Sequence, residues 1–153
     1  MKREIIDKNE IRKFLESNYV IRLAFHTDTA PYIVPMNYGF EYDGIKLTFY
    51  LHSGMHGRTF ELAKEKPYIG FEIDFVYEVR TKEHACEFSI SYESIIGTGH
   101  LYLIEDLDEK IHCLNRLMHQ FTEAELWEYP ENMLQKTAAF KLIVDNFTMK
   151  KNS

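Results

Sequence analysis

The chain has 153 residues and a formal net charge of −6 at neutral pH. That length fits one compact domain, residues 1–153, which buries enough surface on folding to need no disulfide or metal staple. The acidic balance argues against nucleic acid as a partner, because such proteins need a basic face to displace counterions. No apolar run approaches the ~20 residues that cross a bilayer, and no apolar h-region follows the first residues. We therefore expect a cytoplasmic protein with no membrane partner, in which Cys86 and Cys113 stay reduced.

The first third of the chain predicts a helix followed by hairpin strands. Asp7 and Glu10 have the spacing of a capping box, and an apolar stripe at helical spacing follows as far as Asn18. Apolar and polar residues then alternate, as in strands with one face in a core. The predicted strands cover residues 21–26, 32–42 and 45–52. Asp43-Gly44 is a strong hairpin signal between the last two.

The rest of the chain alternates between helical and strand patterns. We expect a helix at 55–66, a strand at 69–75 and an exposed loop at 78–85. A β-rich segment follows at 88–104, and a helix of about four turns begins after a second capping box at Asp106. The last elements are an irregular stretch with one helical turn at 122–136 and a final strand from Phe140. Gly97 and Gly99 interrupt the β-rich segment and suggest a bend or a close backbone approach. About six strands with mostly hairpin connections favour a small antiparallel barrel, mainly β with flanking helices.

One segment departs from its strand pattern because it contains a proline. The segment consists of Val34, Pro35, Met36, Asn37 and Tyr38. A proline inside a strand removes a hydrogen-bond donor, so it marks an edge, a bulge or a place where the ladder opens. An open ladder offers backbone N–H and C=O groups to a ligand. An ordinary β-bulge explains the same residues without any ligand, and the segment alone favours that interpretation.

A second segment joins the end of a strand to the start of a helix. It runs His52, Ser53, Gly54, Met55, His56, Gly57, Arg58. Two glycines allow a sharp turn, and a helix start offers free N–H donors and partial positive charge. This cluster of donors is typical of a phosphate site, although a solvated loop is an equal alternative. His52 and His56 are four apart, but no Glu follows the first histidine and no third ligand is evident, so we expect no metal site.

The segment Pro31–Glu41 resembles the signature strand of the nitroimidazole-resistance (Nim-type) flavoproteins, which belong to the pyridoxamine-phosphate-oxidase-like split-barrel superfamily. Four further stretches agree in the right order: Phe49–Ser53, Gly57–Arg58, Lys66–Asp74 and Tyr92–Gly99. The resemblance covers nearly the whole chain. It implies a six-stranded antiparallel split barrel that forms a homodimer, with one FMN in each of two clefts between the protomers.

The resemblance also implies roles for individual residues. Val34, Pro35, Met36, Asn37 and Tyr38 would lie along the isoalloxazine, mainly through their backbone. His52, Ser53, Gly57 and Arg58 would hold the phosphate side of the cofactor. Ser94 would reach the flavin of the other subunit. The C-terminal residues lack the basic and aromatic character that binds substrate in the vitamin B6 oxidases, and Thr59 replaces a lysine of that branch. Both departures argue against pyridoxine phosphate as the substrate.

The expected activity is therefore that of an FMN-dependent oxidoreductase. A reduced nicotinamide would supply electrons that pass to a small electrophile, such as a nitroaromatic or nitroimidazole. His52 is the candidate catalytic proton donor, because imidazole titrates near neutrality. A structural or phosphate-binding role for His52 is an equal alternative. The alternative function is a non-catalytic flavin- or haem-binding protein built on the same barrel.

Overall fold

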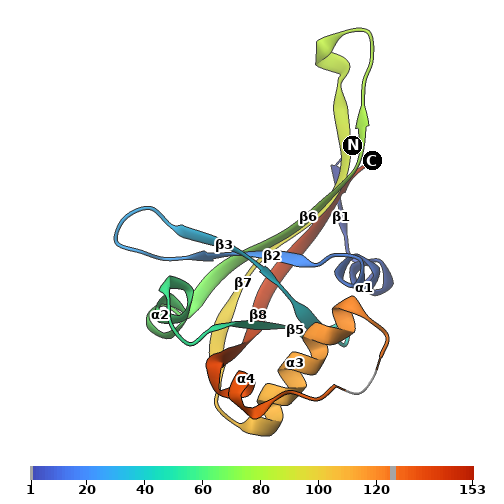
Figure 1. Cartoon of the computed structure of the whole chain (residues 1–153). Helices are drawn as coiled ribbons and strands as arrows, with labels where there is room; N and C mark the ends of the chain where they lie inside the picture. Colours follow the sequence, from blue (N-terminus) through green and yellow to red (C-terminus); the bar gives the residue numbers. More distant parts are fainter. Residues whose placement is uncertain (1, 125–126) are drawn as a thin grey trace.

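One antiparallel sheet forms the body of the molecule (Figure 1). The computed structural model describes residues 2–124 and 127–153. The strands in these residues are β1 (Lys2–Ile5), β2 (Val20–Phe25), β3 (Tyr32–Asn37), β4 (Gly39–Tyr42), β5 (Leu47–Gly54), β6 (Tyr68–Arg80), β7 (Ser89–Ile104) and β8 (Thr137–Asn152). Their order in the sheet is β3-β2-β6-β7-β8-β5-β4. β1 shares one edge of β8 with β5, because β5 pairs with the first half of β8 and β1 pairs with the second half.

The helices flank this sheet. They are α1 (Lys8–Glu16), α2 (Arg58–Glu65), α3 (Leu107–Phe121) and α4 (Glu131–Lys136), with a single 3-10 turn at Ala85–Glu87. Asp7 and Asp106 are confirmed as the N-cap residues of α1 and α3. The Asp7 carboxylate accepts two backbone N–H groups at 2.9 Å, and the Asp106 carboxylate accepts one at 3.0 Å. Among the described residues, no helix combines the length and apolar character needed to cross a membrane.

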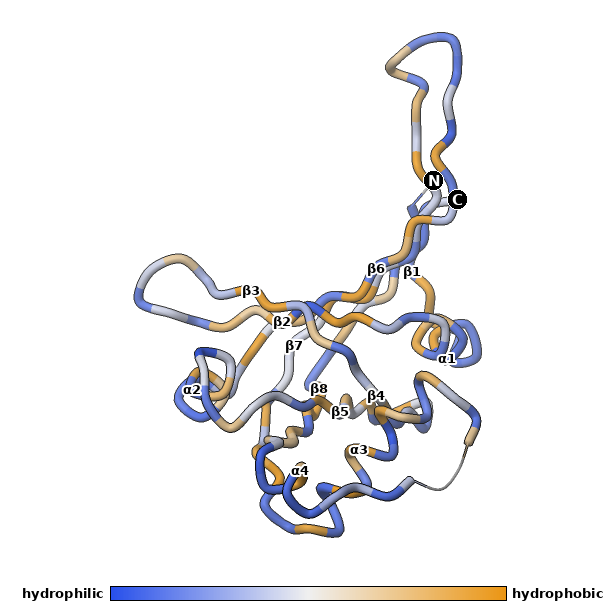
Figure 2. The backbone as a smooth tube through the Cα atoms, viewed as in Figure 1, coloured by the Kyte–Doolittle hydropathy of each residue, from blue (hydrophilic) through white to orange (hydrophobic). Residues whose placement is uncertain are grey.

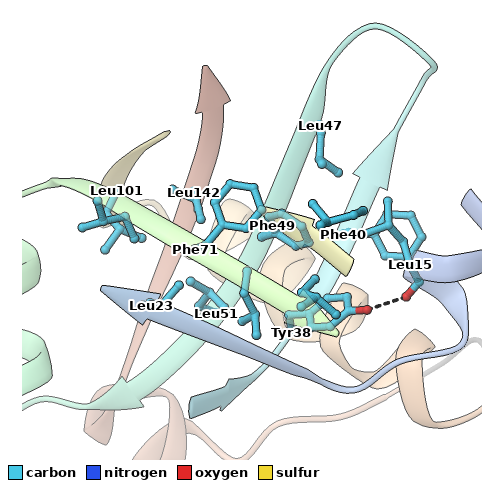
Figure 3. Packing of buried hydrophobic residues seen from close by; sticks show 14 of the residues in the cluster. Leu15, Leu23, Tyr38, Phe40, Leu47, Phe49, Leu51, Phe71, Leu101 and Leu142 are labelled. Carbon is cyan, nitrogen blue, oxygen red and sulfur yellow. Dashed lines mark hydrogen bonds between the residues drawn. The ribbon is translucent and has the colours of Figure 1, made fainter. Parts of the chain in front are cut away.

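The core lies inside the curved sheet, where alternate residues of each strand meet (Figure 3). The ring of Phe49 packs edge-on against Phe71 at 5.2 Å and against Tyr38 at 5.3 Å between ring centroids. Tyr38 is fully buried, and its hydroxyl donates to the Leu15 carbonyl oxygen at 2.6 Å. This bond ties the end of α1 to the point where β3 gives way to β4.

The sheet differs from the predicted six-stranded barrel in two places. It has eight strands in the described residues and is not closed. β1 is a strand that the sequence pattern did not predict, because no turn residues mark it. Its residues pair with the end of β8. The segment predicted as one strand at 32–42 is two strands, because β3 pairs with β2 whereas β4 pairs with β5. These two strands follow each other in sequence yet lie at opposite ends of the strand order.

The two glycines of β7 confirm the predicted close approach. A side chain at Gly97 or at Gly99 would come within 2.5 Å of a backbone oxygen of β8. The register between β7 and β8 also shifts at Thr98/Gly99. The absence of a Cβ is therefore what lets these two central strands pair tightly where the sheet bends.

β6 and β7 extend well beyond the body as a two-stranded hairpin (Figure 1). We call residues 75–92 the arm. The sequence predicted an exposed loop at 78–85, but β6 continues as a strand to Arg80. Its ladder with β7 contains one extra residue between Val76 and Glu78.

Candidate functional site

The start of α2 leaves its backbone donors without a side-chain cap. β5 ends at Gly54, and Gly57 is the N-cap residue of the helix. Gly57 has a φ of 113°, a region that side chains other than hydrogen rarely tolerate. A Cβ built there would meet nothing within 4 Å, so the glycine is required for its backbone conformation and not for space. The first N–H groups of α2 are thus available to an anionic ligand.

Arg58 connects the start of α2 to β3, the strand that contains the proline segment. Its guanidinium carbon lies 4.5 Å from the centroid of the Tyr32 ring, at the beginning of β3. Arg58 is exposed, and within residues 2–124 and 127–153 no carboxylate lies at ion-pair distance from it. An arginine without a carboxylate partner, held beside an uncapped helix start in a chain of net charge −6, is suited to a phosphate group.

β3 lies at the edge of the sheet, and this position explains its proline. Pro35 is opposite Arg22, and the register of β3 with β2 is continuous along the whole strand. The bulge interpretation is therefore wrong, and the edge interpretation is confirmed. The ladder to β2 does not open, but the outer edge of β3 keeps backbone groups available to a ligand.

The side chains of the same segment divide between two surfaces. Val34 and Met36 are half-buried and pack against the core, whereas Pro35 and Asn37 are exposed. Tyr38 faces the core completely, and burial raises the pKa of its phenol far above the ordinary value. The whole residue is enclosed, so neither the side chain nor the backbone of Tyr38 lies on the surface of this chain.

His52 and Ser53 point to opposite faces of β5, because successive strand residues alternate. His52 lines a pocket of about 160 Å³ beneath α3 and α4, together with Leu114, Tyr129, Met133, Leu134 and Thr137. His52 is an exposed residue, but the partial burial of its ring lowers the pKa of the imidazole. The Ser53 hydroxyl donates to the adjacent Gly54 carbonyl at 2.9 Å. The two side chains therefore do not act on one surface.

Ser94 lies on a different part of the molecule, which we call the open face. This is the outer side of β2, β6, β7 and β8 that carries Arg22, Glu72, Asp74, Ser94, Ile96 and Lys150. Ser94 lines a hollow of about 360 Å³ on this face with Ile96 and Lys150. It is seven residues, about 23 Å, along β7 from Leu101, whose N–H donates to the Pro67 carbonyl just after α2. Ser94 and Arg58 of one chain are accordingly in separate places.

A second hollow on the open face, of about 510 Å³, is lined by Arg22, Ile33, Glu72, Asp74, Ile96 and others. Arg22 pairs with Glu72 at 3.2 Å and with Asp74 at 3.6 Å. Burial, followed by the neighbouring Asp74, raises the pKa of Glu72 to about 7 in spite of Arg22. Alternation along β6 places the two carboxylates on one face of the strand. Arg22 comes from β2, which pairs with β6 in the sheet although the two strands are far apart in sequence.

Sequence reasoning missed the role of Tyr32. The residue lies inside the segment that resembles the flavoproteins, but only its contact with Arg58 shows that it holds that side chain. An aromatic residue at the start of an edge strand was the available signal. Nothing local in the sequence indicates that α2 begins beside it, since the two are 26 positions apart, at 32 and 58.

A family model described as pyridoxamine 5'-phosphate oxidase matches residues 7–151. The chain belongs to this family. Its fold is also that of solved members. A protein from Bacteroides thetaiotaomicron, whose proposed role is 5-nitroimidazole antibiotic resistance, is 28% identical with a TM-score of 0.81, and the match covers 99% of this chain and 87% of that one. A comparison with curated proteins finds no match.

Two further solved structures share the family fold at lower identity. A flavocytochrome from Azotobacter vinelandii is 18% identical with a TM-score of 0.82, over 98% of this chain and 69% of that one. An FAD- and haem-binding protein from Mycobacterium smegmatis is 19% identical with a TM-score of 0.85, over 98% and 73%. The predicted split-barrel family is thus confirmed.

Proposed function

We propose that this chain is an FMN-dependent oxidoreductase that passes electrons from a reduced nicotinamide to a small electrophile such as a nitroaromatic. The observation that carries the proposal is Arg58, an exposed cation held against Tyr32 beside the uncapped start of α2. The family membership and the likeness to the Bacteroides thetaiotaomicron protein support the flavin and the substrate class.

The residues present fit the cofactor. Arg58 and the first N–H groups of α2 would bind the phosphate, with Gly57 allowing close approach. The outer edge of β3 would lie along the isoalloxazine through its backbone, beside the exposed Pro35 and Asn37 side chains. When bound, the flavin supplies the electron- and hydride-transfer chemistry, and the chain supplies orientation and charge.

His52 is the residue we propose for proton handling. Burial lowers the pKa of His52, which favours the neutral imidazole. The adjoining pocket of about 160 Å³ is large enough for a small heterocycle and largely apolar in its lining residues.

The proposal includes a homodimer in the cytoplasm. Ser94 lies apart from Arg58 within one chain, which is the arrangement expected if Ser94 contacts a cofactor held mainly by a second copy. Both cysteines in the described residues are free thiols, as is usual in a reducing compartment.

A second candidate is a flavin- or haem-binding protein without turnover. The flavocytochrome and the FAD- and haem-binding protein share the fold over nearly the whole chain, so FAD and haem both remain cofactor candidates.

The absorption spectrum of the purified protein separates these functions. Oxidised flavin gives two bands, in the near ultraviolet and the blue, whereas haem gives one dominant sharp band. NADH should then bleach the flavin bands in the absence of air, and a nitroimidazole should restore them. Bands that persist with NADH would favour a carrier. A protein that takes up no flavin after incubation with FMN or FAD would contradict both forms of the flavin proposal.

A further inference from the structure

The ring of Tyr32 is held in place by the core. Tyr32 begins β3 opposite Phe25 of β2, and the two ring centroids lie 6.2 Å apart at an interplanar angle of 39°. Phe25 is buried, whereas Tyr32 is half-buried and packs against the core from its rim. Figure 2 shows the hairpin of β2 and β3 projecting from the body of the molecule on the same side as α2. The Tyr32 ring is therefore a fixed surface at the start of β3.

Arg58 is a side chain that needs such a surface. It is exposed and is the first residue of α2, directly after the positive-φ residue Gly57. In the part of the chain that the structure describes, neither an ion pair nor a hydrogen bond holds its guanidinium. The contact that holds it is the Tyr32 ring, whose centroid lies 4.5 Å from the guanidinium carbon. A free arginine side chain loses much rotamer freedom when a ligand orders it.

An aromatic partner holds an arginine without competing for its ligand. A carboxylate would accept guanidinium N–H groups and cancel the positive charge, so a phosphate would have to displace it. A ring attracts the cation through its π face but carries no net charge. Arg58 therefore keeps its full charge, and its N–H donors make no hydrogen bond within residues 2–124 and 127–153.

We propose that Tyr32 is a positioning residue for the cofactor phosphate. Its ring holds the Arg58 guanidinium beside the start of α2 before the ligand arrives, so less side-chain freedom is lost when the phosphate binds. The inference rests on the phosphate site of the proposed function and adds a residue that sets the affinity of that site. It also makes the Tyr32 ring matter more for FMN than for riboflavin, which has no phosphate.

The test is a double-mutant cycle between Tyr32 and Arg58, measured by flavin fluorescence titration. Tyr32→Leu removes the ring but keeps an apolar side chain against Phe25. It should raise the FMN dissociation constant about two- to fivefold, as expected for an exposed cation–π contact, and leave riboflavin affinity unchanged. Tyr32→Phe keeps the ring and should bind FMN like the wild type. In an Arg58→Ala background, Tyr32→Leu should have no further effect on FMN.

Three results would overturn the positioning role. Equal losses for FMN and riboflavin in Tyr32→Leu would mean that the residue only supports β3. A Tyr32→Phe variant as weak as Tyr32→Leu would assign the effect to the hydroxyl and not to the ring. Tighter FMN binding by Tyr32→Leu would mean that the ring competes with the phosphate for Arg58. An Arg58→Ala variant that binds FMN like the wild type would instead contradict the phosphate site of the proposed function.

A measurement on the unmodified, flavin-free protein covers the case in which Tyr32→Leu does not fold. Nuclear magnetic resonance relaxation gives an order parameter for each arginine Nε–H group. Arg3, an exposed arginine of β1, is the matched control. The order parameter of Arg58 should be clearly higher than that of Arg3, because the Tyr32 ring restricts its side chain. Equal values for the two arginines would overturn the proposal without any substitution at Tyr32.

Discussion

Replacing Arg58 with alanine tests the phosphate site most directly. The substitution removes a cation that is held by the Tyr32 ring and has no carboxylate partner in the described part of the chain. Loss of one charge-assisted contact to a phosphate costs about 1.5–3 kcal/mol, so the FMN dissociation constant should rise about 10–100-fold. The lost cation–π contact is exposed and contributes about 0.5–1 kcal/mol to folding. The melting temperature of the flavin-free protein should therefore fall by about 1–4 °C.

The assay is quenching of flavin fluorescence during titration of the flavin-free protein at fixed ionic strength. Lys64→Ala is the matched control, because it removes one positive charge from the last turn of the same helix, where Lys64 lies over the Phe60 ring. Riboflavin lacks the phosphate and should bind the wild type and Arg58→Ala about equally. If Arg58→Ala and Lys64→Ala weaken FMN binding to the same degree, the effect is general electrostatics and the assignment of Arg58 to the phosphate is wrong.

Three further predictions concern the scaffold around the site. Tyr38→Phe should lower the free energy of unfolding by about 0.5–1.5 kcal/mol, measured in urea, and leave flavin affinity unchanged, because it loses only the buried hydrogen bond to Leu15. Gly97→Ala should prevent soluble expression, since its Cβ would lie 2.5 Å from a backbone oxygen, whereas Gly54→Ala, with its nearest atom at 3.8 Å, should fold normally. Glu72 binds its proton more tightly in the folded state, so its stabilising contribution is present below pH 4.5 and is lost as the pH rises towards 7. Unfolding curves should show Glu72→Gln gaining stability relative to the wild type between pH 5 and about 8; a constant difference would contradict the raised pKa.

The local elements could be predicted because their signals are local. The Asp7 and Asp106 caps, the alternation in the strands and the close approach at Gly97 all follow from residues a few positions apart, and the structure confirms them. β1 could not be predicted, because a four-residue edge strand depends on the strand it joins, β8, at the other end of the sequence. The segment around Tyr38 shows the same limit. Its alternating apolar pattern continues without a break, but the strand before Tyr38 pairs with β2 and the strand after it pairs with β5.

The residues of the candidate site also fall into those that the local sequence predicts and those that it does not. A glycine before a helix and a nearby arginine are readable from the sequence, and Gly57 has the positive φ that this interpretation needs. The placement of His52 beneath α3 and α4 is not readable, because the residues that surround it come from positions 114 to 137. The resemblance implied that His52 and Ser53 both hold the phosphate. Successive residues of a strand point to opposite faces, so the two side chains do not point to the same side of β5.

The order of strands has a consequence for how the chain reaches its folded state. β2 with β3 and β4 with β5 are hairpins of neighbouring residues, and they can form as soon as those residues are available. In the finished sheet, however, β6, β7 and β8 separate the two hairpins, and β8 is the strand that joins β7 to β5. The two halves of the sheet consequently stay uncoupled until the final 16-residue strand has been synthesised. A chain arrested before residue 137 should remain sensitive to protease, and the flavin should bind only after that strand has closed the gap.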